Sequence, residues 1–118
     1  IIAQSHKALL KVIFETDYLQ ASHIVKLCQL CSELQVDFVK TSTGFGFTKR
    51  ESGDYNYTGA TIEHIQLMLD NIEGSVQVKA SGGIRTYDYA KELSDMGVAR
   101  LGTSASQAIA DGGIGEGY

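Results

Sequence analysis

Residues 76–86 read Val-Gln-Val-Lys-Ala-Ser-Gly-Gly-Ile-Arg-Thr, which predicts a β-strand that leads through a glycine turn into an α-helix. The strand is Val76–Ala80, where apolar and polar residues alternate. The turn contains Gly82-Gly83. Thr86 has a side chain of the kind that caps a helix N-terminus, and the helix is expected to run to Met96, before a glycine. A strand, a turn and a helix in this order are the repeating unit of a parallel α/β fold.

The same order of strand and helix recurs on both sides of this unit. Further short runs rich in β-branched, aromatic or apolar residues predict strands at Leu9–Glu15, Asp37–Thr41 and Ala99–Gly102. Further helices are expected at Ala21–Leu34, between Thr61 and Gly74, and at Ser104–Ala110. The chain therefore reads as four consecutive βα units with a parallel sheet, whose apolar strands are typical of a sheet covered on both faces. Two segments remain, a loop rich in Gly and Tyr at Thr43–Gly59 and a tail at Asp111–Tyr118 that we expect to be flexible.

Composition limits the class of protein. With 118 residues, of which 43% are hydrophobic, the chain is long enough for one domain with a core. It has no apolar run of membrane-spanning length, and its formal charge of −4 argues against a general electrostatic grip on nucleic acid. The two cysteines, Cys28 and Cys31, are too few for a disulfide scaffold, which favours a cytoplasmic setting. Both fall on the apolar face of a predicted helix, so core packing is favoured over a zinc site.

Lysines inside apolar strands are the sharpest anomaly of the sequence. Lys40 and Lys79 each lie near the C-terminal end of a predicted strand, and Lys11 lies in a third strand. The C-terminal ends of parallel strands are where active sites form. Ammonium groups that meet there lower one another's pKa, and a neutral amine is a nucleophile toward carbonyls. The alternative is that these lysines pair with carboxylates such as Glu15 or Asp37, or extend to the surface.

Two glycine-containing turns give a second signal. Residues 80–86 and 101–105 each lead from a strand into a helix. Glycine lets the backbone approach a ligand, and a helix N-terminus offers N–H groups to an anion. Together with nearby hydroxyls, from Ser81, Thr103 and Ser104, the two turns resemble the phosphate site of a TIM barrel. The alternative is that the glycines only end the strands.

Taken together, these residues resemble deoxyribose-phosphate aldolase. The matching segments cover nearly the whole chain: LKVIFET at 10–16, DFVKTSTGFG at 37–46, GAT at 59–61, VKASGGIRT at 78–86 and RLGTSA at 100–105. The resemblance implies a class I aldolase on a TIM (β/α)8 barrel. This chain, residues 1–118, would be a single incomplete domain that corresponds to strands five to eight, the second half of the barrel. The segment at 46–59 is longer than in many members of the family.

The resemblance also implies roles for individual residues. Lys40 matches the Schiff-base lysine, Lys79 matches the second catalytic lysine, which lowers the pKa of the first and assists proton transfer, and Lys11 lines the same site. Tyr118 matches a terminal tyrosine that folds over the site. Residues matched to substrate and phosphate binding are Thr41, Gly44, Gly82, Gly83, Gly102 and Ser104. No metal and no organic cofactor are implied.

The substrate implied by the resemblance is a sugar phosphate, 2-deoxy-D-ribose 5-phosphate, which is cleaved reversibly to acetaldehyde and D-glyceraldehyde 3-phosphate. The family's catalytic aspartate belongs to the other half of the barrel, so the expected partner is a missing N-terminal half-barrel or a second subunit. A homo-oligomer is expected, with neither nucleic acid nor a membrane as partner. Two alternatives stay open: another phosphate-binding TIM-barrel enzyme, and a half-barrel that does not catalyse a reaction.

Overall fold

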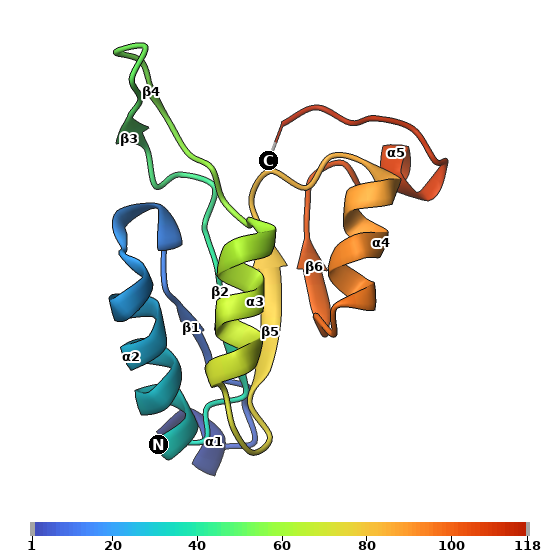
Figure 1. Cartoon of the computed structure of the whole chain (residues 1–118). Coiled ribbons are helices and arrows are strands. Elements are labelled where there is room, and N and C mark those ends of the chain that lie inside the picture. Colours follow the sequence, from blue (N-terminus) through green and yellow to red (C-terminus); the bar gives the residue numbers. More distant parts are fainter. Residues whose placement is uncertain (1, 118) are drawn as a thin grey trace.

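The computed structural model describes residues 2–117. Four parallel strands form one sheet in the order β1-β2-β5-β6 (Figure 1). Their bounds are β1 Lys11–Ile13, β2 Phe38–Lys40, β5 Gln77–Ser81 and β6 Arg100–Gly102. Each lies at a predicted strand, and the parallel pairing is confirmed. The observed strands β1, β2 and β6 are shorter than predicted because the pairing ladder covers only the central residues of the first two and leaves out Ala99 of the third.

Helices follow the strands and pack on one face of the sheet (Figure 1). They are α2 at Ala21–Glu33, α3 at Ile62–Asn71, α4 at Tyr87–Asp95 and the short α5 at Ser106–Ala110. The predicted caps are confirmed, because Thr61 Oγ1 accepts a hydrogen bond from the backbone N–H of His64 and Thr86 Oγ1 accepts one from Tyr89. The structure thus has the four βα units that the sequence predicts.

The core lies between the sheet and these helices. Val39, Val78 and Ala80 point into it from the sheet and are at most 1% exposed. Cys28 and Cys31 of α2 are free and buried in the same cluster. Burial raises the pKa of the Cys28 thiol to about 12, with a further contribution from Cys31, so this thiol is held in its unreactive protonated form at neutral pH. The prediction that both cysteines belong to the core is confirmed.

The segment at 43–59 differs from the prediction of an irregular loop. It contains a two-stranded antiparallel hairpin, β3 at Thr48–Lys49 and β4 at Tyr55–Asn56, which rises beyond the C-terminal end of the sheet (Figure 1). The strands are two residues long, too short to produce a readable alternation of apolar and polar residues. The structure also contains two short elements that were not predicted, α1 at Ile2–Ser5 and a 3-10 turn, η1, at Thr16–Tyr18, and α5 begins two residues after the predicted Ser104.

Within residues 2–117, none of the helices combines the length and the apolar character that a bilayer crossing requires. The face of the sheet opposite α2, α3 and α4 carries no helix of the described chain (Figure 1). The sequence pattern predicts cover on both faces, and the chain itself supplies it on one. The side chains that point to this open face include those of the three singled-out lysines, as described next.

Candidate active site

The pairing register brings Lys40 and Lys79 together on the open face of the sheet. Lys40 lies directly beside Lys79 on the neighbouring strand, and Ile13 and Arg100 continue the row on either side. Side chains alternate between the faces of a sheet, so residues that are paired in register share a face. Lys11, two residues before Ile13, points to the same side. The sequence-predicted lysines therefore converge on one face, on three adjacent strands.

Lys79 is the lysine whose pKa the structure lowers. Partial burial is the largest cause, and the charges of Lys40, Lys11 and Arg100 add to it in that order. Within residues 2–117 the only salt bridge joins Lys91 to Asp95 on α4, so no described carboxylate pairs with the lysines of the open face. The alternative that these lysines pair with Glu15 or Asp37 is wrong for the described chain.

Glu15 instead fixes the backbone that follows Lys40. Its carboxylate accepts hydrogen bonds from Ser42 Oγ at 3.0 Å and from the backbone N–H of Thr43 at 3.0 Å, and also from the Thr43 hydroxyl. Glu15 has a left-handed backbone with φ of 54°, a conformation that a residue other than glycine keeps only where its surroundings enforce it. The three hydrogen bonds provide that enforcement, and they hold residues 42–43 next to the end of β1.

Thr41 and Gly44 take part in the same network. Thr41 is fully buried, and its hydroxyl donates to the Ser81 carbonyl oxygen at 2.8 Å and accepts from the Ser81 N–H at 3.0 Å. The Gly44 N–H donates to Ser42 Oγ at 2.9 Å, and Gly44 has a positive φ of 82°. The structure thus uses the Thr41 hydroxyl to tie β2 to β5 and does not present it at the surface.

The two glycine turns lie side by side, since they follow the neighbouring strands β5 and β6. Gly82 and Gly83 have φ of 89° and 76°, and a Cβ at Gly59 would lie 2.5 Å from the Gly82 carbonyl oxygen. Glycine is required at this contact because two backbones touch. Gly102 ends β6, and Ser104 follows it at the same edge of the sheet. The predicted phosphate-binding residues are therefore brought together near the lysine row.

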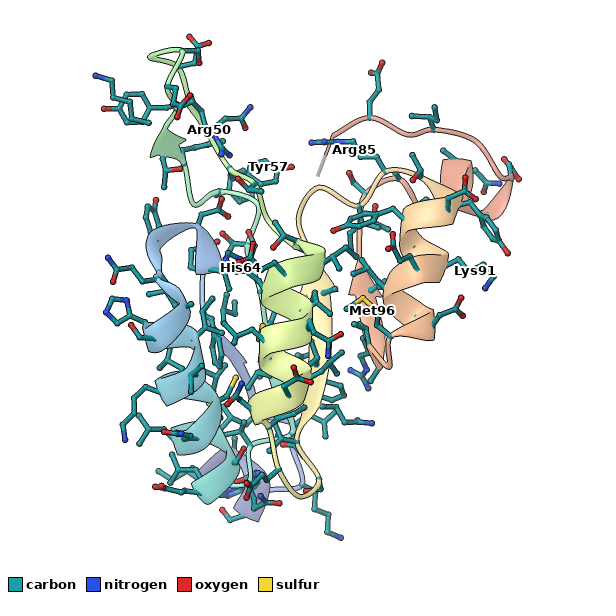
Figure 2. All side chains as sticks on the ribbon, in the orientation of Figure 1. Arg50, Tyr57, His64, Arg85, Lys91 and Met96 are labelled. Atoms are coloured by element: carbon teal, nitrogen blue, oxygen red, sulfur yellow. The ribbon has the colours of Figure 1, made fainter. Side chains whose placement is uncertain are left out.

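Arg85 joins three segments above this edge (Figure 2). Its Nε donates to the Gly117 carbonyl oxygen at 2.7 Å, and its Nη2 donates to the Tyr57 hydroxyl at 3.3 Å. The backbone carbonyl of Arg85 also accepts from the Gly115 N–H at 2.8 Å. Arg85 thus connects the hairpin and the tail to the glycine turn in which it lies. Sequence reasoning assigned no role to Arg85, because its partners lie about 28 and 32 residues away.

Tyr118 lies outside the described residues, so its predicted position over the site is not addressed by the structure. Glu15 and Arg100 are further residues of the site: from the sequence, Glu15 is considered only as a possible partner of the lysines, and Arg100 is given no role. The Glu15 contacts depend on its left-handed backbone, and the Arg100 side chain contacts the Phe38 ring on β2, two strands away in the sheet. Neither contact has a local signal in the sequence. A surface hollow of about 520 Å³ lies elsewhere, lined by Gln29, Gln35, Asn71 and their neighbours.

Comparison with known proteins agrees with this geometry. A deoxyribose-phosphate aldolase of Vibrio vulnificus is 48% identical over 104 residues, which are 88% of this chain and 43% of that protein. The chain is similar to the C-terminal part of deoxyribose-phosphate aldolase. Among solved structures, an aldolase called QR15 superposes with a TM-score of 0.76 at 38% identity, over 93% of this chain and 45% of its own. The deoxyribose-phosphate aldolase of Aeropyrum pernix, described as a unique tetramer, gives a TM-score of 0.75 at 26% identity, over 93% of this chain and 43% of its own.

The resemblance to deoxyribose-phosphate aldolase predicted from the sequence is confirmed, and so is the fold as the second half of a TIM barrel. The chain spans less than half the length of the relatives it matches. No protein-family model matches it. The open face of the sheet is the side on which such a barrel has its interior.

Proposed function

We propose that the protein to which this chain belongs is a deoxyribose-phosphate aldolase, a lyase that works through a Schiff base on Lys40. The observation that carries the proposal is the register pair of Lys40 and Lys79 on the open face, at the strand ends where both glycine turns begin. A pair of close amines, one of them with a lowered pKa, suits the capture of an aldehyde. The similarity to named aldolases supports the same reading.

In the proposed reaction the neutral amine of Lys40 attacks C1 of open-chain 2-deoxy-D-ribose 5-phosphate, and water leaves to form an iminium ion. A base removes the C3 hydroxyl proton, the bond between C2 and C3 breaks, and its electrons form an enamine. D-glyceraldehyde 3-phosphate leaves. Lys79 then assists protonation of C2, and water hydrolyses the iminium ion to release acetaldehyde and restore Lys40. Each electron pair remains within the adduct or its products, so the steps need no metal or redox cofactor.

The substrate phosphate is proposed to bind at the paired turns that contain Gly82, Gly83, Gly102 and Ser104, with Gly44 and the Thr41 backbone near the reacting carbons. Lys11 lines the site, and Tyr118 closes over it. This arrangement holds the phosphate away from the bond that breaks and uses its binding energy for orientation. The part of the barrel that precedes this chain would supply the aspartate of the proton relay. Residues 1–118 are proposed to be one incomplete domain of a cytoplasmic protein. That protein is proposed to be a homo-oligomer, as the Aeropyrum pernix relative, described as a tetramer, is.

The first experiment traps the Schiff base. The chain is incubated with acetaldehyde and borohydride, and peptides are mapped by mass spectrometry for an N-ethyl lysine. The expected result is an adduct confined to Lys40, which the Lys40→Met variant loses while the exposed Lys26 stays unmodified in both. Equal labelling of Lys26 and Lys40 would contradict a selectively activated amine.

A second protein separates a wrong function from a missing half. This chain is joined to the preceding part of the Vibrio vulnificus aldolase, in place of the segment that it matches. Cleavage of 2-deoxy-D-ribose 5-phosphate by the joined protein, lost in its Lys40→Met variant, supports the proposal even if the isolated chain forms no adduct. A folded joined protein that neither traps acetaldehyde nor cleaves the substrate would refute it.

A further inference from the structure

The aromatic ring of Phe38 is contacted by two positively charged side chains, those of Lys11 and Arg100. Phe38 is 5% exposed, and the Arg100 Cζ lies 4.3 Å from the ring centroid while the Lys11 Nζ lies 5.7 Å from it. Both distances fall within the range of cation–π attraction. Phe38 is on β2 and Arg100 is on β6, so the arginine side chain reaches across β5 to meet the ring. The position of the Arg100 side chain is therefore fixed by its contact with the Phe38 ring as well as by the strand to which it belongs.

Lys79 lies between Arg100 and Lys40. The register pairs Lys79 with Lys40 on one side and with Arg100 on the other. Its Cε lies 3.1 Å from the position that a Cβ on Gly102 would occupy, so the lysine stem leans over β6 toward the C-terminal edge, two residues beyond Arg100. Charged groups that face Lys79 come from β1, β2 and β6: Lys11, Lys40 and Arg100. All three are cations.

We propose that Arg100, stacked on Phe38, is a positioning residue for Lys79: it holds a permanent positive charge below the amine and directs the lysine stem past Gly102 toward the C-terminal ends of the strands. Arginine suits this task because it stays charged at every working pH and lies flat on an aromatic ring. A lysine at that position would be able to lose its proton and its stacking. The consequence for catalysis rests on the proposed function, since it concerns the lysine that assists Lys40.

The test measures Lys79 without any substrate. The chain is labelled with a limiting amount of acetic anhydride across a range of pH at low ionic strength, and mass spectrometry gives the rate at each lysine. Arg100→Gln is expected to raise the apparent pKa of Lys79 by roughly a few tenths of a pH unit, since it removes one of the three positive charges that face the amine. Lys26, exposed on α2, serves as the internal reference, and its labelling curve is expected to be the same in the variant and the parent.

Two further variants separate charge from structure. Arg100→Lys keeps a charge and is expected to restore most of the parental Lys79 curve. Phe38→Leu keeps an apolar side chain but removes the aromatic face, and it is expected to raise the pKa of Lys79 by less than Arg100→Gln does. If Arg100→Gln loses its folded circular dichroism, the Phe38→Leu result decides.

An unchanged Lys79 curve in a folded Arg100→Gln variant, or in Phe38→Leu where the first does not fold, would overturn the proposal. The two proposals also fail separately. A Lys79 response to Arg100, together with a folded joined protein that neither traps acetaldehyde at Lys40 nor cleaves the substrate, would uphold the positioning role and refute the aldolase function. A Schiff base at Lys40 together with a Lys79 curve that does not change in Arg100→Gln would support the aldolase function and overturn the positioning role.

Discussion

Gly102 leaves the space that the Lys79 side chain occupies. A Cβ there would lie 3.0 Å from Ser81 Cβ and 3.1 Å from Lys79 Cε, and the φ of Gly102 is outside the left-handed region. Gly102→Ala therefore introduces crowding without backbone strain. We expect a loss of about 1 kcal/mol in the free energy of unfolding and a changed labelling curve at Lys79, since the lysine stem has to move. Urea unfolding and the acetic anhydride experiment measure the two effects.

Gly113→Ala is the matched control for this prediction. Its φ is also outside the left-handed region, and a Cβ there would lie 3.4 Å from the Ala108 carbonyl oxygen, at the edge of ordinary contact. The control should leave the Lys79 curve unchanged. A Gly102→Ala variant that labels at Lys79 like the parent would show that the glycine is not needed for the lysine's position.

At the scale of elements, the sequence predicted every strand of the parallel sheet and the helices that cover it. It did so because Val78, Ile65 and Leu93 belong to apolar patterns with the period of their own element. The hairpin at 48–56 escaped prediction since its strands are short and its position is set by contacts outside itself. The same reason hid Arg85 and Arg100, whose partners come from other strands and loops. Lys40 and Lys79 were found because a charge inside an apolar strand is visible locally.

Asp17 is the contact that holds the return strand of this hairpin. Its carboxylate accepts hydrogen bonds from the backbone N–H of Thr58 and from that of Gly59, the latter at 3.0 Å. Asp17→Asn leaves one acceptor oxygen and turns an N–H₂ toward the other donor. We expect a local loss of about 2 kcal/mol, or about 30-fold faster hydrogen exchange at the Thr58 and Gly59 amides. Exchange followed by NMR gives the rates residue by residue.

Asp54→Asn tests whether any lost charge on the hairpin has this effect. Asp54 is exposed in the hairpin loop, so its substitution should leave exchange at the two amides within about twofold of the parent. Equal exchange rates in Asp17→Asn and the parent would mean that the hairpin is docked by other contacts, such as the hydrogen bond from the Tyr18 hydroxyl to the Phe47 carbonyl oxygen.

At the scale of the whole molecule, charge is unevenly distributed. The chain has a formal charge of −4, yet its open face carries Lys11, Lys40, Lys79 and Arg100. Such a cluster costs stability in the isolated chain, and the cost is expected where chemistry needs a neutral amine. The lowered pKa of Lys79 fixes the sign of the pH dependence. Between that value and the unfolded value near 10.5, the unfolded chain binds more protons, so Lys79 makes stability rise with pH.

Lys79→Met is therefore expected to stabilise the isolated chain at neutral pH. Removing one of several mutually repelling charges near the surface should raise the free energy of unfolding by about 0.5 kcal/mol at low salt. The gain should shrink in 0.5 M NaCl, because salt screens the repulsion. It should also shrink as the pH rises toward 10.5, because Lys79 of the folded parent loses its proton first and the repulsion disappears with it. Urea unfolding at two salt concentrations and two pH values measures all three effects.

Lys91→Met is expected to change the free energy of unfolding in the opposite direction to Lys79→Met. Lys91 pairs with Asp95 four residues later on α4, so its loss should lower stability slightly, as expected for an exposed helical pair. If Lys79→Met also destabilises the isolated chain, the lysines of the open face do not repel one another enough to matter. In the protein joined to the preceding part of the Vibrio vulnificus aldolase, the gain from Lys79→Met should disappear or reverse. There the aspartate proposed for the other half would face the lysines, and a charge that is costly in this chain would become part of a paired site.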